Sequence, residues 1–275
     1  MRGNGDDGLA TWNQDACGAR DLHDNIFAYN TVELGWRAGG IAVYGGTGHH
    51  IYNNFVTDMA LAAGIHLNST FPGTKFNANN KPDGIKFENN TIVRSGTNCD
   101  IFGNDLAAVD VHKTGGSLQN IMFYNTEIYD APCFGITVLN DPDNIKFINT
   151  KILGAGLTGM STSYSTTPVT FCAIRADQAT PIFDGLEIGN VHKDVLGNNQ
   201  TWPLWTNNNH QKADAIKYTN IKKKYVAPEP PYADKDQQGG IIDPMDGLSG
   251  YNVKLEGISW KNAKGSSDLK EGDAV

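Results

Sequence analysis

The sequence has little of what builds a metal centre or a nucleic-acid-binding surface. Its four cysteines show no CxxC spacing and no accompanying histidine pair, which argues against a zinc site. Acidic residues outnumber basic residues by 30 to 22, giving a formal charge of −8. No basic stripe with interleaved aromatic residues is present to neutralise phosphates, so nucleic acid is not an expected partner.

Other features that the sequence lacks limit the possible folds and the possible association with membranes. No run is long and apolar enough to cross a membrane, and no signal peptide is visible. No segment places apolar residues at helical spacing. Asp141, Asp143 and Asn144 have side chains that calcium accepts, but nothing in the sequence sets their geometry, so neither a metal nor a cofactor is expected.

One short phrase recurs seven times in the chain. It consists of an isoleucine, usually an aromatic residue two positions later, then asparagine and further apolar residues. Successive phrases are 24 to 37 residues apart, which is the period range of coiled repeat architectures. The phrase isoleucines are Ile26, Ile51, Ile85, Ile121, Ile145, Ile182 and Ile216.

Each phrase has the pattern of a β-strand. Apolar and polar residues alternate with period two, and Val, Ile, Phe and Tyr dominate. A second short strand precedes most phrases and a third follows them, with Asn- and Gly-rich corners between. The sequence therefore predicts an all-β protein, a right-handed parallel β-helix with about three strands per coil.

Stacked coils place equivalent residues about 4.8 Å apart, so aligning the strands that precede the phrases predicts columns of neighbours. Residues two apart in a strand share a face, which separates core columns from outward columns. Two columns face the core: Leu9, Ile41, Ile65, Val109, Ile136, Ile174, and Thr11, Val43, Leu67, Val111, Val138, Ala176. Two face outward: Ala10, Ala42, His66, Asp110, Thr137, Arg175, and Trp12, Tyr44, Asn68, His112, Leu139, Asp177.

The repeat divides the chain into three parts. Residues 1–225 form a partial β-helix domain, residues 226–240 a Pro- and Gly-rich linker, and residues 241–275 a tail that packs back on the coil or begins another module. Six residues before the first strand are too few to cap the open core. We therefore expect an N-terminally incomplete chain of a secreted, monomeric protein whose signal peptide lies outside this sequence.

The candidate catalytic residues are Asp6 and Asp7, which precede Gly8 at the start of the first strand. Two adjacent carboxylates repel, so one pKa is expected to rise while the other group stays ionised, as an acid and base pair requires. A kink at Gly8 would place both groups on one outer face. The alternative is that Asp-Asp-Gly is a solvated turn.

The outward columns supply candidate substrate-binding residues. Large rings on this face are suited to stacking on sugars, although Trp12 and Tyr44 would alternatively cover a loop. The alternative for His66 and Asp110 is a hydrogen-bonded surface pair. The predicted substrate-binding set, which includes two residues at the edge of the face, is Trp12, Trp36, Arg37, Tyr44, His66, Asp110 and His112.

The stretches GDDGLATW, DNIFAYN and GGIAVYGG resemble the catalytic region of β-helical glycoside hydrolases, and the resemblance spans about residues 4–200. The chain most resembles glycoside hydrolase family 87, the α-1,3-glucanases and mycodextranases, and more distantly family 49 dextranases and the polygalacturonases. This resemblance implies inverting, endo-acting hydrolysis of α-glucan, with Asp6 as the acid and Asp7 helping to activate water. The family's third aspartate, about one coil upstream, is lacking here.

The resemblance to polygalacturonases is incomplete, because WRAGGIAVY replaces their Gly-His-Gly and Arg-Ile-Lys features. With the net negative charge, this favours a neutral glycan over pectin. Two other classes stay open. A polysaccharide lyase would need a basic residue such as Arg37 or Arg175, and a non-catalytic, glycan-binding or adhesive β-helix would agree with the lacking aspartate.

Overall fold

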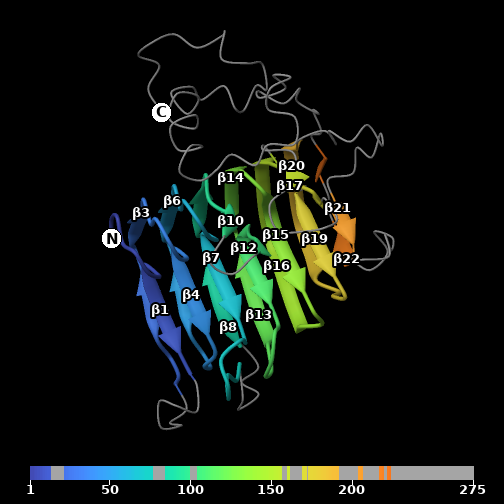
Figure 1. The fold of residues 1–275 in the computed structure, drawn as a ribbon. Helices are drawn as coiled ribbons and strands as arrows, with labels where there is room; N and C mark the ends of the chain where they lie inside the picture. The colour runs from blue at the N-terminus through green and yellow to red at the C-terminus, as the bar shows by residue number, and fades with distance from the viewer. Residues whose placement is uncertain are drawn as a thin grey trace.

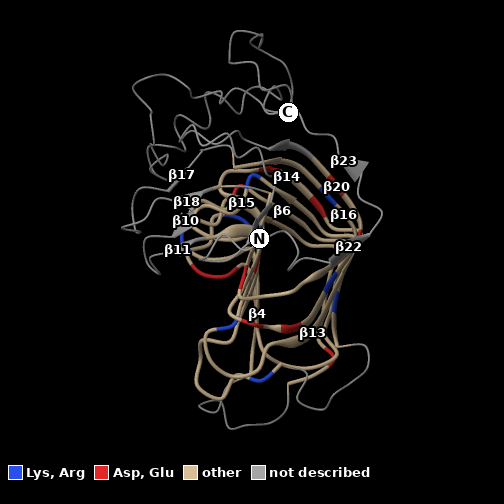
Figure 2. Ribbon diagram, turned by 90° about the vertical axis from the view of Figure 1, so that its right-hand side faces the viewer, with Lys and Arg blue, Asp and Glu red and all other residues tan. Residues whose placement is uncertain are grey.

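The computed structural model describes residues 1–13, 22–76, 84–99, 104–156, 160–161, 169–171, 173–191, 204–206, 217–219 and 222–223. Over these residues the protein is all β, and the strands of both main sheets are parallel (Figure 1). Viewed along the stack, successive coils superpose (Figure 2). The predicted parallel β-helix is confirmed, and its handedness stays a prediction. None of the described segments is a helix able to span a membrane.

The first sheet contains one strand from each coil and carries the candidate site on its outer face. Its strands follow the order β1-β4-β7-β12-β15-β19-β21. Their bounds are Leu9–Trp12 (β1), Ile41–Tyr44 (β4), Ile65–Asn68 (β7), Ala107–His112 (β12), Phe134–Leu139 (β15), Ile174–Asp177 (β19) and Leu204–Thr206 (β21).

The second sheet consists of two ladders that meet in long strands. One ladder is β2 (Ile26–Ala28), β5 (His50–Tyr52), β8 (Ile85–Glu88) and β13 (Gln119–Tyr124). The other is β3 (Thr31–Glu33), β6 (Phe55–Thr57), β9 (Thr91–Val93) and β14 (Glu127–Ala131). Both join β16 (Asp143–Ala155), which pairs with β20 (Ile182–Val191), and β20 pairs with β22 (Lys217–Thr219) and β23 (Lys222–Lys223).

The number of strands therefore varies along the stack, because β16 and β20 each span both ladders. Two antiparallel pairs stand apart from the coils: β10 (Asn98–Cys99) with β11 (Asn104–Asp105), and β17 (Met160–Ser161) with β18 (Val169–Thr170). Cys133 is buried, whereas Cys17 and Cys172 lie outside the described residues. The predicted linker at 226–240 and tail at 241–275 lie outside them as well.

The columns predicted for the first sheet are confirmed by its register. Leu9 pairs with Ile41, Ile41 with Ile65, and the series continues through Val109 and Ile136 to Ile174. From Ile41 onward the members of this column are fully buried. Alternation along each strand therefore separates core from outer face as expected.

The register of the second sheet corrects the alignment of the seven phrases. Ile51 pairs with Phe87 rather than with Ile85, and Ile182 pairs with Lys146. Ile26 pairs with His50 and is 62 % exposed. Since side chains alternate with period two, a shift of one residue moves an isoleucine from the core to the outer face.

Aromatic rings fill the core position that the phrases share. Phe87, Phe123, Phe147 and Phe183 stack at successive centroid separations of 4.7, 4.5 and 4.9 Å. All four rings are fully buried, and each stacks nearly parallel on the next. The coil spacing of about 4.8 Å thus matches the distance at which aromatic rings pack.

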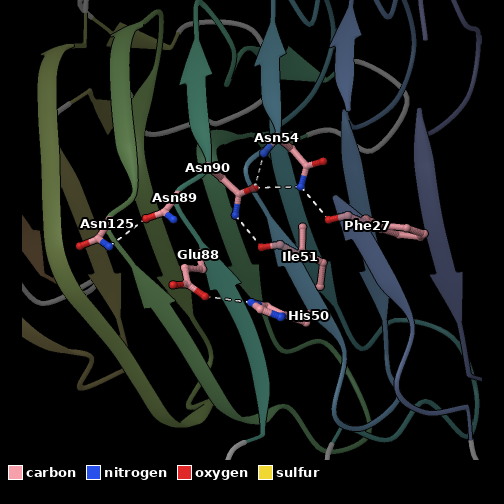
Figure 3. A network of polar contacts seen from close by, with 8 residues as sticks. All are labelled: Phe27, His50, Ile51, Asn54, Glu88, Asn89, Asn90 and Asn125. Carbon is pink, nitrogen blue, oxygen red and sulfur yellow. Dashed lines mark hydrogen bonds and ion pairs between the residues drawn. The ribbon is translucent and has the colours of Figure 1, made fainter. Parts of the chain in front are cut away.

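The corners are held by asparagines. Asn53, Asn89, Asn125 and Asn149 have φ between 50° and 54°, a left-handed conformation that asparagine tolerates better than most residues. The residue after two of these corners is a buried asparagine, and Figure 3 shows how the pair stacks. Asn54 donates from its backbone and side chain to Asn90 Oδ1, at 3.1 and 2.9 Å.

Each buried asparagine also bonds a backbone carbonyl of the preceding coil. Asn54 Nδ2 donates to the Phe27 carbonyl at 2.9 Å and Asn90 Nδ2 to the Ile51 carbonyl at 2.8 Å. The buried ladder therefore satisfies backbone groups that the turn removes from the sheet. On the outside, Asn125 Nδ2 donates to Asn89 Oδ1 at 2.8 Å in a solvent-exposed ladder (Figure 3).

We predict that Asn90→Ala lowers the free energy of unfolding by about 2–5 kcal/mol, because the Ile51 carbonyl and both Asn54 donors lose their partner in the interior. Urea denaturation followed by circular dichroism measures the change. The matched control is Asn125→Gly, whose side chain is exposed and whose φ of 50° suits glycine. Equal losses in the two variants would show that the buried ladder has no special weight.

Candidate active site

Asp6 and Asp7 lie just before β1, where the backbone bends at Asp6 and again at Gly8. The segment joins the stack through Gly8 N–H, which donates to the Gly39 carbonyl at 2.9 Å. The backbone bends at Gly8, where a kink was predicted, and Gly8 keeps φ outside the left-handed region. A Cβ on Gly8 would lie 2.5 Å from Val32 Cγ1 and 2.6 Å from the Gly40 carbonyl oxygen, so only glycine fits.

Both carboxylate oxygens of Asp7 accept hydrogen bonds from the next coil. Gly39 N–H donates to Oδ1 at 2.8 Å and the Tyr44 hydroxyl to Oδ2 at 3.0 Å. Burial raises the pKa of Asp7 above its ordinary value, while Tyr44, Gly39 and His66 oppose the rise. Repulsion from Asp6 also raises this pKa, but it contributes less than burial, contrary to the expectation that repulsion dominates.

Asp6 lies on the solvent side of Asp7. Its side chain is exposed, and its Oδ1 accepts the backbone N–H of Asp7 at 2.9 Å. Trp36 lies beside it, with its indole over Gly5 and its backbone N–H donating to the Asn4 carbonyl at 3.1 Å. Since 55 % of Trp36 is exposed, its accessible ring lies close to the accessible carboxylate of Asp6.

Trp12 and Tyr44 belong to an aromatic cluster with Phe71. Trp12 stacks on Phe71 at 4.3 Å, and Tyr44 meets both rings edge-on at 5.2 and 5.0 Å. Trp12 is 42 % exposed, so it keeps an open ring face, but Tyr44 is only 9 % exposed. The ring of Tyr44 is largely covered and its hydroxyl donates to Asp7, so this residue agrees with the alternative of a ring that packs under a loop, and its contact with sugar stays a prediction. Phe71, on a connecting loop, escaped the strand-based sequence analysis.

His66 and Asp110 stand one above the other on β7 and β12, as their column predicted. His66 Nδ1 lies 3.1 Å from Asp110 Oδ2, and the Thr137 hydroxyl donates to Oδ1. Asp110 is fully buried, so its predicted contact with substrate is wrong and the alternative of a bonded pair holds, although in the interior rather than at the surface.

Burial alone would raise the pKa of Asp110, but the hydrogen bond and charge of His66, the charge of His112 and the Thr137 hydroxyl together lower it below the ordinary value. Asp110 is thus a buried carboxylate that its neighbours keep ionised. Burial also lowers the pKa of His112, together with His66 and Arg175, while Asp110 opposes them. His112 Nε2 lies 3.0 Å from Asn140 Nδ2.

The two basic residues considered for a lyase have different surroundings. Arg37 is exposed, and the Arg175 guanidinium lies 3.2 Å from Asp177 Oδ2 and 5.6 Å from the centre of the Phe134 ring. Among the residues that the structure describes, no group of three or more His, Cys, Asp or Glu side chains forms a metal site.

We predict that Asp110→Asn lowers the free energy of unfolding by about 2–4 kcal/mol at pH 7, because it removes one charge of a buried pair. A carboxylate whose folded pKa is depressed stabilises the fold above its unfolded pKa and loses that effect as the pH falls through the folded pKa. The deficit should therefore shrink below about pH 4. Denaturant titrations across pH test this, with the exposed Asp143→Asn as control. A deficit independent of pH would contradict it.

The fold of the chain is similar to that of solved catalytic domains. No family model and no curated sequence matches it. The chain is similar to the Agl-KA catalytic domain, with a TM-score of 0.61 and 28 % identity over 80 % of this chain and 35 % of that one. It is also similar to an aspartate-to-alanine variant of a glycoside hydrolase family 87 alpha-1,3-glucanase catalytic domain in complex with tetrasaccharides, with a TM-score of 0.51 and 16 % identity over 82 % and 39 %.

These comparisons confirm the resemblance to family 87 catalytic domains at the level of structure. The chain spans between a third and two-fifths of the length of these structures. The activity and substrate of the whole protein are therefore matters of proposal.

Proposed function

We propose that the protein is a glycoside hydrolase that cleaves α-glucosidic bonds in a neutral polysaccharide such as α-1,3-glucan, with inversion. The observation that carries the proposal is the paired placement of Asp6 and Asp7 at one end of the outer face, with Asp6 exposed and Asp7 held by two donors. The similarity to the Agl-KA catalytic domain and to a family 87 domain that binds tetrasaccharides supports it.

The two carboxyl groups have different environments, since Asp6 is exposed and Asp7 is half-buried. In the proposed reaction Asp6 transfers its proton to the leaving glycosidic oxygen, and Asp7 takes a proton from the water that attacks the anomeric carbon from the opposite side. One C–O bond breaks and one forms, and the two proton transfers balance. Burial gives Asp7 the higher proton affinity that a base needs, while the Tyr44 and Gly39 donors favour its ionised form.

A neutral substrate agrees with the charge of this face. Asp6 and Asp7 bring two carboxyl groups to a protein of net charge −8, so an anionic polymer would add like charges at the reacting bond. The exposed rings of Trp12 and Trp36 offer apolar surfaces on which neutral sugar rings stack.

We predict that Asp6→Asn and Asp7→Asn each reduce the release of reducing ends from α-1,3-glucan by about 10²–10⁴-fold, because each removes a proton-transfer group. Proton NMR of the first products from the unaltered protein should show the β-anomer. Circular dichroism confirms that both variants are folded. Full activity in either variant would contradict the mechanism, and binding of glucan without cleavage by the unaltered protein would instead indicate a glycan-binding β-helix.

We predict that Trp36→Ala raises KM about tenfold and changes kcat little, because the exposed ring supplies binding energy away from the reacting atoms. Initial rates over a range of soluble α-glucan oligosaccharides separate the two constants. The matched control is Tyr29→Asn, which removes a ring that is 75 % exposed on the second sheet and installs the residue found at later corners. Equal changes in KM would deny Trp36 a role in binding.

A further inference from the structure

The orientation of Asp7 is fixed from both sides of its carboxylate. Gly39 N–H and the Tyr44 hydroxyl occupy different oxygens, at 2.8 and 3.0 Å, so the group cannot rotate without breaking a bond. A Cβ on Gly39 would lie 3.2 Å from Asp7 Oδ1 and 3.5 Å from the Cβ of His66. The Asp7 and His66 side chains thus approach each other over Gly39.

Tyr44 is held in place by rings on three sides. Trp12, Phe71 and His66 surround it at centroid separations of 5.2, 5.0 and 5.9 Å. Burial raises the pKa of Tyr44 well above its ordinary value, and the negative charge of Asp7 adds to the rise. The hydroxyl therefore keeps its proton over the whole working pH range and remains a donor to Asp7.

Behind Tyr44, the buried Asp110 fixes the ring of His66. Asp110 Oδ2 lies 3.1 Å from His66 Nδ1, within the distance of an ion pair, so the carboxylate packs directly against this ring. Thr137 holds the other oxygen of Asp110, so the pair is anchored on two further strands. The residues behind the Asp7 carboxylate thus come from four successive coils, on strands β4, β7, β12 and β15.

We propose that Tyr44 is a positioning residue that fixes Asp7 for abstraction of a proton from water, and that the buried pair of His66 and Asp110 holds Tyr44 against it. The proposal rests on the proposed function, in which Asp7 is the base. It assigns to Tyr44, His66 and Asp110 a role behind the reacting group in place of contact with sugar.

The direction of the pH effect follows from the groups that face Asp7. These are Asp6 on its own segment, Tyr44 on β4 and His66 on β7, with Asp110 of β12 behind them. The Tyr44 hydrogen bond lowers the pKa of Asp7, so losing it raises that pKa further. A base must be ionised to act, and the acidic limb of the rate profile therefore moves to higher pH when the hydroxyl is removed.

The test is Tyr44→Phe, which removes the hydroxyl and keeps the ring between Trp12 and Phe71. We expect kcat to fall about 10–100-fold on α-glucan oligosaccharides with KM within about twofold, and the acidic limb of kcat/KM to move to higher pH. The matched control is Tyr52→Phe on β5, whose ring lies on the second sheet, and it should behave as the unaltered protein.

A second measurement does not depend on activity. The carboxyl carbon of Asp7, assigned by its loss in Asp7→Asn, is titrated by ¹³C NMR and should titrate at higher pH in Tyr44→Phe. Gly39→Ala, which crowds Asp7 Oδ1 and leaves Tyr44 intact, should also lower kcat.

The measurements distinguish a failure of the Tyr44 proposal from a failure of the proposed function. Unaltered kcat, pH profile and Asp7 titration in Tyr44→Phe, beside an inactive Asp7→Asn, would overturn this proposal and leave the proposed function standing. Full activity in Asp7→Asn would overturn the proposed function and this proposal together. A lowered kcat in Tyr44→Phe with an unmoved Asp7 titration would also overturn it, since a general loss of structure would then be the cause.

Discussion

The parallel pairing of each coil with the next is the constraint on which the whole molecule depends. Because strands repeat about every 4.8 Å, the nearest neighbour of a side chain is the equivalent residue of the next coil, often 24 to 36 residues away in sequence. Core packing, corner hydrogen bonds and the candidate site are all built on that rule. Three features follow from this pairing of equivalent residues. They are the phenylalanine stack, the Asn54–Asn90 ladder, and the column from Ala42 through His66 and Asp110 to Thr137.

The stacking of coils also explains why polar residues are tolerated in the core and needed on the outer face. An asparagine amide presents donors and an acceptor, so one buried asparagine can bond the coil before and the coil after, as Asn54 does by accepting from Asn30 and donating to Asn90. On the outer face the same repetition brings Asp7, Tyr44 and His66 together from three coils. The asparagine ladder stabilises the scaffold, and the arrangement on the outer face brings together the side chains of the candidate site.

Sequence periodicity was enough to predict the first sheet, because strict alternation specifies which residues face inward and which neighbour they meet. It failed where alternation is ambiguous: the recurring isoleucine at Ile26, Ile51 and Ile182 does not keep one register position. It also missed Phe71 and the burial of Tyr44 and Asp110. Those depend on connecting segments that cover the outer face, and such segments vary in length and carry no period.

The buried carboxylate of Asp110 and the half-buried carboxylate of Asp7 differ in what their partners do. His66, His112 and Thr137 together outweigh the burial of Asp110, so its folded pKa is depressed and its ionised form adds stability above its unfolded pKa. Asp7 faces mainly neutral donors, which do not outweigh burial, so its folded pKa is raised. The stability that Asp7 contributes is present below its unfolded pKa and lost as the pH rises through the folded one. An ionised Asp7 is therefore a cost to the fold, which is the direction expected of the carboxylate that we propose as the base.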